Sequence, residues 1–205
     1  MDQPTEEVTI LQEAIDIFVD GGPVMAALGI IAAILYGTCI ATYMFVNRGN
    51  LNVKQKHQWE DWIVNPDEAD GRIGEVIQYA LHGPKVTISV VQRRIAEVYE
   101  TVVSKLDRRL ILIGALIAIA PMTGLLGTVG GMLSMFDGLA GGNGEQGAQK
   151  IAEGMKEALF TTLTGLVVSL PGMFLALYIK TKRDAIANTI MGLQSAIVKS
   201  KFSKL

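Results

Sequence analysis

The chain has 205 residues, of which 50% are hydrophobic and 19% are charged. Soluble domains carry about 25% charged residues, so this composition favours a membrane protein over a soluble one. Its single cysteine, Cys39, excludes a disulfide within the chain and a metal site built from several cysteines, and it is expected to be a packing residue.

The first 22 residues carry six acidic side chains and no Lys or Arg. A cleavable signal peptide needs a basic start and a shorter apolar run, so the apolar run that follows is interpreted as a retained span. Ile10, Leu11, Ile15 and Phe18 share one side of a possible helix. Residues 1–22 are therefore predicted to form a periplasmic amphipathic segment, which lies on the membrane surface, binds a partner or is simply solvated.

Three stretches contain no charged residue over 20 or more positions: 23–46, 110–136 and 158–179. About 20 apolar residues at ~1.5 Å rise cross a hydrocarbon core of ~30 Å. The sequence therefore predicts three transmembrane helices at these ranges. Span one is apolar apart from a few Thr and Tyr residues, and it is expected to face lipid.

The basic residues predict the orientation of these spans. Of 18 Lys and Arg residues, 16 lie in 47–109 or after residue 179, and only Lys150 and Lys156 lie between spans two and three. By the positive-inside rule the N-terminus and the 137–157 connection are periplasmic. The 47–109 segment and the 180–205 tail are then cytoplasmic. Basic side chains there are expected to face solvent or lipid headgroups, so nucleic acid is not an expected partner.

Both cytoplasmic segments show helical periodicity. Val91, Ile95, Val98, Val102 and Leu106 form one apolar stripe, and no Gly or Pro occurs from 85 to 113. A helix is expected to start near Pro84 and to run into span two, over about 80 Å in all. The tail continues span three with a similar stripe. The predicted fold is an all-α membrane protein whose second and third helices extend far into the cytoplasm as a bundle, with Trp59 and Trp62 as anchors and short helices from 50–83.

Spans two and three carry stripes of small and hydroxylated residues. The stripes are Thr123, Gly127, Gly130, Ser134; Gly124, Thr128, Gly131; and Ala158, Thr162, Gly165, Ser169, Gly172, Ala176. Close helix packing explains the glycines, since small residues let helix backbones approach in lipid. The hydroxyl groups of Thr128 and Thr162 favour a polar lumen, and packing stays open as the alternative. Pro121 and Pro171 are expected to bend their helices.

The spans contain no Asp, Glu, Lys, Arg or His, and Glu157 stands at the outer mouth of span three. A proton relay across a membrane usually needs an ionisable group, so another subunit would have to supply it. His57 and His82 are isolated, and no nucleophile–base set or metal-ligand spacing occurs. An enzyme is therefore not expected, and neither a metal nor a cofactor. The run Gly141–Gly142–Asn143–Gly144 lacks the Lys-Ser/Thr of a phosphate loop and predicts a turn.

Two ordered motifs carry a resemblance to a known family. The run APMTGLLGTVGGM at 120–132 and the run IAEGMKEALFTT at 151–162 resemble signatures of the ExbB/TolQ/MotA proton-channel family. The close resemblance covers about 110–183. Three spans in about 205 residues look more like ExbB, and next TolQ, than the four-span MotA. Gly130 stands where many ExbB proteins have Trp.

The resemblance implies an inner-membrane homopentamer around two single-span ExbD- or TolR-like subunits, which bring the missing aspartate, with a TonB-like protein as a further partner. It also implies that Thr128 and Thr162 face that aspartate and that Glu157 is the family glutamate. The predicted ion pathway is Thr128, Thr162, Thr161, Ser169 and Thr123. The predicted packing residues are Gly124, Gly127, Gly131, Gly165 and Gly172.

The function expected from these observations is a stator or channel subunit of a motor driven by the proton-motive force, which energises outer-membrane transport or envelope work. The alternatives are a TolQ-type envelope-maintenance or gliding motor and a non-conducting membrane scaffold. A secondary transporter is less favoured, because inverted repeats and a broken-helix site are not evident.

Overall fold

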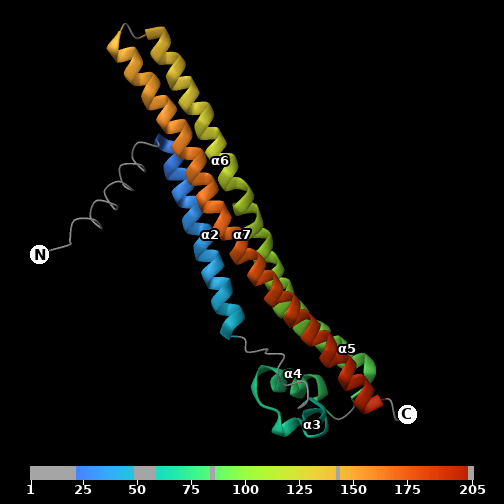
Figure 1. Cartoon of the computed structure of the whole chain (residues 1–205). Helices are drawn as coiled ribbons and strands as arrows, with labels where there is room; N and C mark the ends of the chain where they lie inside the picture. Colours follow the sequence, from blue (N-terminus) through green and yellow to red (C-terminus); the bar gives the residue numbers. More distant parts are fainter. Residues whose placement is uncertain (1–21, 49–58, 84–85, 142–143, 203–205) are drawn as a thin grey trace, which may run out of the picture. The chain divides into compact units, whose positions relative to one another are not determined.

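The computed structural model describes residues 22–48, 59–83, 86–141 and 144–202, and all regular elements in these ranges are helical (Figure 1). The predicted N-terminal segment lies outside the described residues, apart from Gly22. The elements are α2 (Gly22–Arg48), α3 (Trp59–Val64), η2 (Pro66–Glu68), α4 (Gly71–Leu81), α5 (Ile88–Tyr99), η3 (Glu100–Ser104), α6 (Lys105–Gly141) and α7 (Glu145–Phe202).

Three helices are long and apolar enough to cross a membrane: Gly22–Asn47, Ile88–Gly141 and Glu145–Phe202. This confirms the all-α membrane fold with long second and third helices. The helix that contains span two joins α5, η3 and α6 over 54 residues. Helix α6 contains Pro121 and α7 contains Pro171, and neither proline ends its helix.

The predicted periplasmic connection is almost entirely helical. Helix α6 continues to Gly141 and α7 begins at Glu145. Gly144 directly precedes α7 with a φ of 75°. This left-handed backbone conformation suits a residue without a side chain and lets the chain reverse between the two helices.

The chain divides into two compact units. Unit 1 contains residues 22–39 and 113–175 of the described chain, and unit 2 contains residues 40–112 and 176–202. In unit 1, α2, α6 and α7 lie side by side (Figure 1). Met25 and Leu28 of α2 and Ala120 of α6 are buried there, with Phe160 and Val168 of α7 packed against them. Span one thus has a buried face as well as the lipid-facing surface that the sequence predicts.

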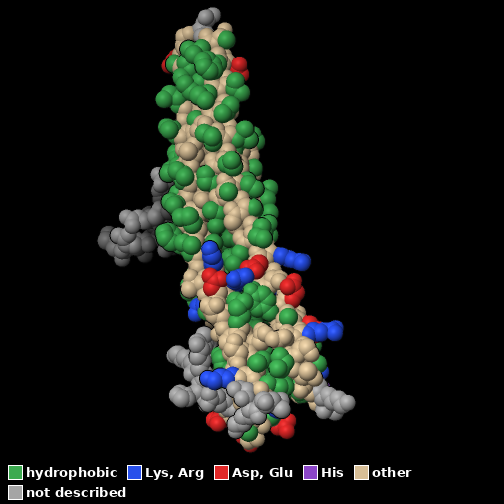
Figure 2. Space-filling view, turned by 90° about the vertical axis from the view of Figure 1, so that its right-hand side faces the viewer, with side chains coloured by type: hydrophobic (Ala, Val, Ile, Leu, Met, Phe, Trp, Pro, Cys, Tyr) green, Lys and Arg blue, Asp and Glu red, His purple; other side chains and the backbone are tan. Residues whose placement is uncertain are grey.

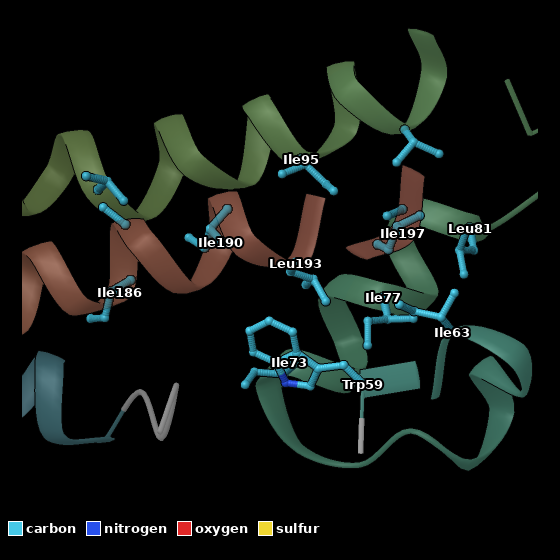
Figure 3. Close-up of a cluster of buried hydrophobic side chains, with 14 of the residues drawn as sticks. Trp59, Ile63, Ile73, Ile77, Leu81, Ile95, Ile186, Ile190, Leu193 and Ile197 are labelled. Atoms are coloured by element: carbon cyan, nitrogen blue, oxygen red, sulfur yellow. The ribbon is translucent and has the colours of Figure 1, made fainter. Parts of the chain in front are cut away.

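Unit 2 has a hydrophobic core built from α3, α4, α5, η3, the start of α6 and the tail of α7. Trp59 and Ile63 of α3 and Ile73 and Ile77 of α4 pack with residues of α5 and of the α7 tail (Figure 3). The tail contributes four evenly spaced side chains: Ile186, Ile190, Leu193 and Ile197. The predicted short helices, the Trp59 anchor and the tail stripe are all present, and Trp62 is partly buried against the same core.

The apolar stripe of the second helix shifts at the π-helical turn η3. Val91, Ile95 and Leu106 are buried as expected, whereas Val103 is fully buried and the predicted Val102 only partly. A π turn holds more residues than an α turn and rotates the side chains that follow it. The strict helical spacing from Val91 therefore selects Val102 in place of its buried neighbour Val103.

An ion-pair cluster joins α6 and α7 in unit 2. The Arg183 guanidinium donates to the Asp107 carboxylate at 2.6 Å and to the Asp184 carboxylate at 2.9 Å. These hydrogen bonds raise the pKa of Arg183 further above its ordinary value. The arginine therefore stays charged and links the two helices where the charge-free runs end.

Candidate functional site

The site lies in unit 1, where α6 and α7 pack through small residues. A Cβ atom on Gly124 would lie 2.7 Å from the Thr161 carbonyl oxygen. A Cβ on Gly127 would collide with the Thr161 side chain, and one on Gly131 would lie 2.9 Å from the Ala158 Cβ atom. The two backbones approach closely because these positions carry no side chain.

Two glycines of α7 make equally close approaches. A Cβ on Gly165 would lie 2.8 Å from the Ala120 carbonyl oxygen of α6. A Cβ on Gly172 would lie 2.9 Å from Leu35 Cδ2 of α2 and 3.4 Å from Ile117 Cγ1 of α6. Gly172 therefore stands where all three spans meet.

The structure places Thr161 inside the protomer. Its side chain is fully buried against Gly127, and its hydroxyl donates to the carbonyl oxygens of Glu157 (2.9 Å) and Ala158 (3.2 Å). The sequence predicts Thr161 as part of the ion pathway. In this arrangement Thr161 has no open surface and serves the contact between α6 and α7.

Thr162 of α7 and Thr128 of α6 are both partly buried. The Thr162 hydroxyl donates to the Ala158 carbonyl at 3.1 Å and lies 3.5 Å from the Gly124 carbonyl of α6. Thr128 follows Gly124 by four residues, so it lies one turn further along that face. The Thr128 hydroxyl donates to the Leu125 carbonyl at 2.7 Å.

Thr123 has a similar local bond. Its hydroxyl donates to the Ile119 carbonyl at 3.0 Å. A threonine hydroxyl has one donor and two acceptor lone pairs. The donors of Thr123, Thr128 and Thr162 are thus engaged with backbone carbonyls, and these side chains offer acceptors to an incoming group.

Ser169 compensates for the proline of the neighbouring helix. Pro121 has no N–H and leaves the carbonyl of Ile117, four residues earlier, without its helical donor. The Ser169 hydroxyl donates to that carbonyl at 3.1 Å from across the interface. This contact explains how α6 continues through Pro121, and it gives Ser169 a partner on α6 that the stripe on α7 did not reveal.

Tyr36 of α2 also donates across a helix interface, and this role was not predicted from the sequence. Its hydroxyl donates to the Val168 carbonyl of α7 at 3.0 Å. Val168 is the neighbour of Val167, whose carbonyl Pro171 leaves without its helical donor. The sequence signal for this contact is a tyrosine in the middle of span one, because a phenolic hydroxyl in lipid needs a hydrogen-bond partner.

Glu157 lies against the beginning of span one. A Cβ on Gly22 would lie 2.5 Å from Glu157 Oε1, and Gly22 is the first residue of α2. Gly22 has a φ of 65°, which favours glycine. The N-terminal end of a helix carries partial positive charge, so it stabilises a carboxylate placed there. Glu157 of α7 and the start of α2 therefore lie together at one end of unit 1.

The outer surface of this unit is strongly apolar. Figure 2 shows hydrophobic side chains along one face of the helices over a long stretch without acidic or basic groups. Its most exposed members include Met122, Leu125 and Leu126 of α6 and Leu159 and Phe174 of α7. Exposed apolar surface of this extent belongs in a bilayer or against other membrane helices.

Comparisons with known proteins point to one family. The family model described as "MotA/TolQ/ExbB proton channel family" matches residues 68–192. The chain is 41% identical over 66 residues to a biopolymer transport protein exbB1 of Vibrio cholerae, covering 32% of this chain and 28% of the relative. It is 43% identical over 61 residues to a putative biopolymer transport protein ExbB-like 1 of Synechocystis, covering 29% and 24%.

The match thus spans about a quarter of the length of each curated relative. No solved structure matches the chain. The family match covers both sequence motifs and most of α6 and α7, so it includes the whole contact between Gly124 and Thr162.

Proposed function

Because the chain belongs to the MotA/TolQ/ExbB proton channel family, we propose that it is the ring-forming channel subunit of an inner-membrane motor driven by the proton-motive force. The N-terminus is periplasmic and the C-terminus cytoplasmic in this proposal. The chain is not an enzyme, and its output is mechanical work on a periplasmic or outer-membrane client. Biopolymer transport, the role for which both relatives are named, is the class of client favoured here.

The proton-binding group comes from a partner subunit in this proposal. The supporting observation is that residues 110–136 and 158–179 contain no Asp, Glu, Lys, Arg or His. A proton pathway through a bilayer needs such a group. Two single-span ExbD- or TolR-like subunits, each with one aspartate, stand inside a homopentamer of this chain, and a TonB-like protein receives the force.

The threonine hydroxyls discriminate between the two states of that aspartate. Thr128 and Thr162 already donate to backbone carbonyls, so they accept a hydrogen bond from a protonated carboxyl. A charged carboxylate needs donors, and a hydroxyl supplies one only after breaking its own bond. Protonation therefore lets the aspartate lie against this wall and the partner helix move along it. Loss of the proton to the cytoplasm leaves a carboxylate that finds no free donor on the wall, so the helix cannot move further until the next proton binds.

The driving force is adequate for such a step. One charge that crosses ~100 mV releases about 2.3 kcal/mol, which biases a step between states of similar energy. In a ring of equivalent protomers the successive positions have equal free energy. Each proton can therefore drive one step of the central pair.

Replacement of Thr162 by Val tests the proposal. Valine has nearly the same shape, so the α6–α7 contact is expected to form, while the lumen loses its acceptor. We expect proton flux and client work to fall to background, with the complex still assembled on co-purification. Thr181→Val is the matched control, because the Thr181 hydroxyl donates to its own helix at Leu177 and lies beyond span three. Normal flux in Thr162→Val would refute the assignment.

A non-conducting scaffold is the second candidate, and the close glycine contacts of α6 and α7 favour it. A scaffold would assemble the same bundle and pass no protons. Client work that survives an uncoupler would support the scaffold. A motor of the TolQ type, for envelope maintenance or gliding, uses the same mechanism as the main proposal and differs only in its client.

A further inference from the structure

A cavity of about 350 Å³ opens in unit 2 beside the inner end of α2. Phe45 of α2 and the residues Val98, Val102 and Lys105 line it. Arg72 and Glu75 of α4 complete its polar part. The cavity therefore has apolar lining from α2, α4, α5, η3 and α7, and charged side chains from α4 and α6.

Two cations surround the aromatic ring at this place. Lys105 Nζ lies 5.8 Å and the Arg109 guanidinium carbon 5.2 Å from the centre of the Phe45 ring. The Arg109 Nη1 atom is buried, and within the part of the chain that the structure describes it has no hydrogen-bond partner. A buried donor of a charged group without an acceptor is costly, so the arrangement calls for an anionic acceptor at this edge.

The surface next to these cations suits hydrocarbon chains. Met44 of α2 is 46% exposed, and Ile111 and Leu112 of α6 are 72% and 47% exposed. These residues belong to the ends of the apolar runs, a few positions from the first basic side chains. Leu112 follows Arg109 by three residues and Lys105 by seven, so cationic and apolar side chains follow one another on the same side of α6.

We propose that this place binds the headgroup of an anionic glycerophospholipid from the inner leaflet. The phosphate is held by Lys105 and Arg109, and the acyl chains lie along the exposed apolar surface that begins at Leu112 on the same side of α6. Glu75 repels an anion, but Arg72 stands beside it, and Glu75 can accept a hydrogen bond from a headgroup hydroxyl. Phosphatidylglycerol fits this combination, since its phosphate is anionic and its glycerol carries hydroxyls.

The test uses the purified full chain in mixed micelles that contain phosphatidylglycerol or phosphatidylcholine. We expect the chain to carry phosphatidylglycerol through purification and to melt at a higher temperature with that lipid. Lys105→Gln combined with Arg109→Gln should weaken binding about thirtyfold, because each basic residue near an anionic surface contributes ~1 kcal/mol. Lys105→Arg combined with Arg109→Lys keeps both charges and should retain phosphatidylglycerol binding.

Lys199→Gln combined with Lys201→Gln is the charge-matched control, because both lysines are exposed in the α7 tail. If this control lost as much lipid binding as the Lys105→Gln, Arg109→Gln variant, the loss would come from net charge alone, and the proposed site would be wrong. Equal stabilisation by phosphatidylcholine, or by inorganic phosphate alone, would overturn the choice of an anionic lipid. Retained phosphatidylglycerol binding in the Lys105→Gln, Arg109→Gln variant would also overturn the proposed site. The melting temperature of the Lys105→Arg, Arg109→Lys variant should rise with phosphatidylglycerol as that of the original chain does, which confirms that its fold is intact.

Discussion

Individual threonine hydroxyls in unit 1 differ in how far they are exposed, and therefore in whether they can contact another molecule. Thr161 and Thr162 are adjacent in sequence, but they point about 100° apart around the helix. Thr161 is enclosed against Gly127, whereas Thr162 keeps part of its surface open. The periodic stripe of small residues could not separate these roles, because packing and lumen faces use the same residue types.

Close approach at a single glycine gives the first stability prediction. Gly127→Ala places a methyl group on the Thr161 side chain, and overpacking of this kind costs about 1–3 kcal/mol. We expect a lower melting temperature in detergent. Gly114→Ala on the same helix meets no atom within 4 Å and should be neutral or stabilising. Equal melting temperatures for the two variants would contradict the close contact between α6 and α7.

The surroundings of Pro121 show which part of the site could be predicted from the sequence and which part could not. Pro121 predicts an unsatisfied carbonyl at Ile117, and Ser169 was visible as a polar residue in span three. Only the packing of α7 on α6 connects the two, at 3.1 Å. In the same way, the sequence identifies Glu157 as a carboxylate at the outer mouth, but its contact with Gly22 depends on the position of α2.

Among whole elements, α4 and α5 are joined by a polar contact outside the core. The Tyr79 hydroxyl donates to Glu97 Oε2 at 2.8 Å, and Arg93 donates to Glu97 Oε1 at 3.2 Å. Both bonds favour the carboxylate and lower the pKa of Glu97, while the carboxylate raises the pKa of Tyr79. Arg94 adds a bond to the Tyr79 carbonyl at 3.2 Å, near the end of α4.

This contact predicts an acid-dependent stability of unit 2. Because the pKa of Glu97 is lowered on folding, its contribution is complete above the unfolded-state value of about 4.3 and is lost as the pH falls through the lower folded-state pKa. Trp59 is buried in the core of this unit and Trp62 is partly buried against it, so their fluorescence reports its unfolding in denaturant. We expect Glu97→Gln to lower the denaturant midpoint at pH 7 and to have little effect near pH 3.

Glu100→Gln provides the control, since it removes the same charge from the next turn. Its midpoint should change with pH as that of the original chain does. A Glu97→Gln difference that stays the same at both pH values would show that the carboxylate is not stabilised by folding.

For the whole molecule, the architecture could be predicted from hydropathy and charge, whereas the roles of individual residues depend on how the helices pack. Three charge-free runs of sufficient length predict three spans, and uninterrupted periodicity predicts helices that continue beyond them. Both properties depend on the sequence near each residue and on the thickness of a bilayer. The rotation of each helix about its axis, the shift at η3 and the buried face of α2 depend on contacts between distant residues, which one sequence does not specify.

The charge distribution predicts which ends of the long helices lie on each side of the membrane. With 16 of 18 basic residues in 47–109 or the tail, Glu145 at the start of α7 should be periplasmic and Lys199 near its end cytoplasmic. Cys39 is the single native cysteine and is buried. After Cys39→Ser, a membrane-impermeant maleimide should label Glu145→Cys in cells with a permeabilised outer membrane and Lys199→Cys only after lysis. The opposite pattern would invert the topology, and the proton would then leave toward the periplasm, against the release to the cytoplasm that we propose.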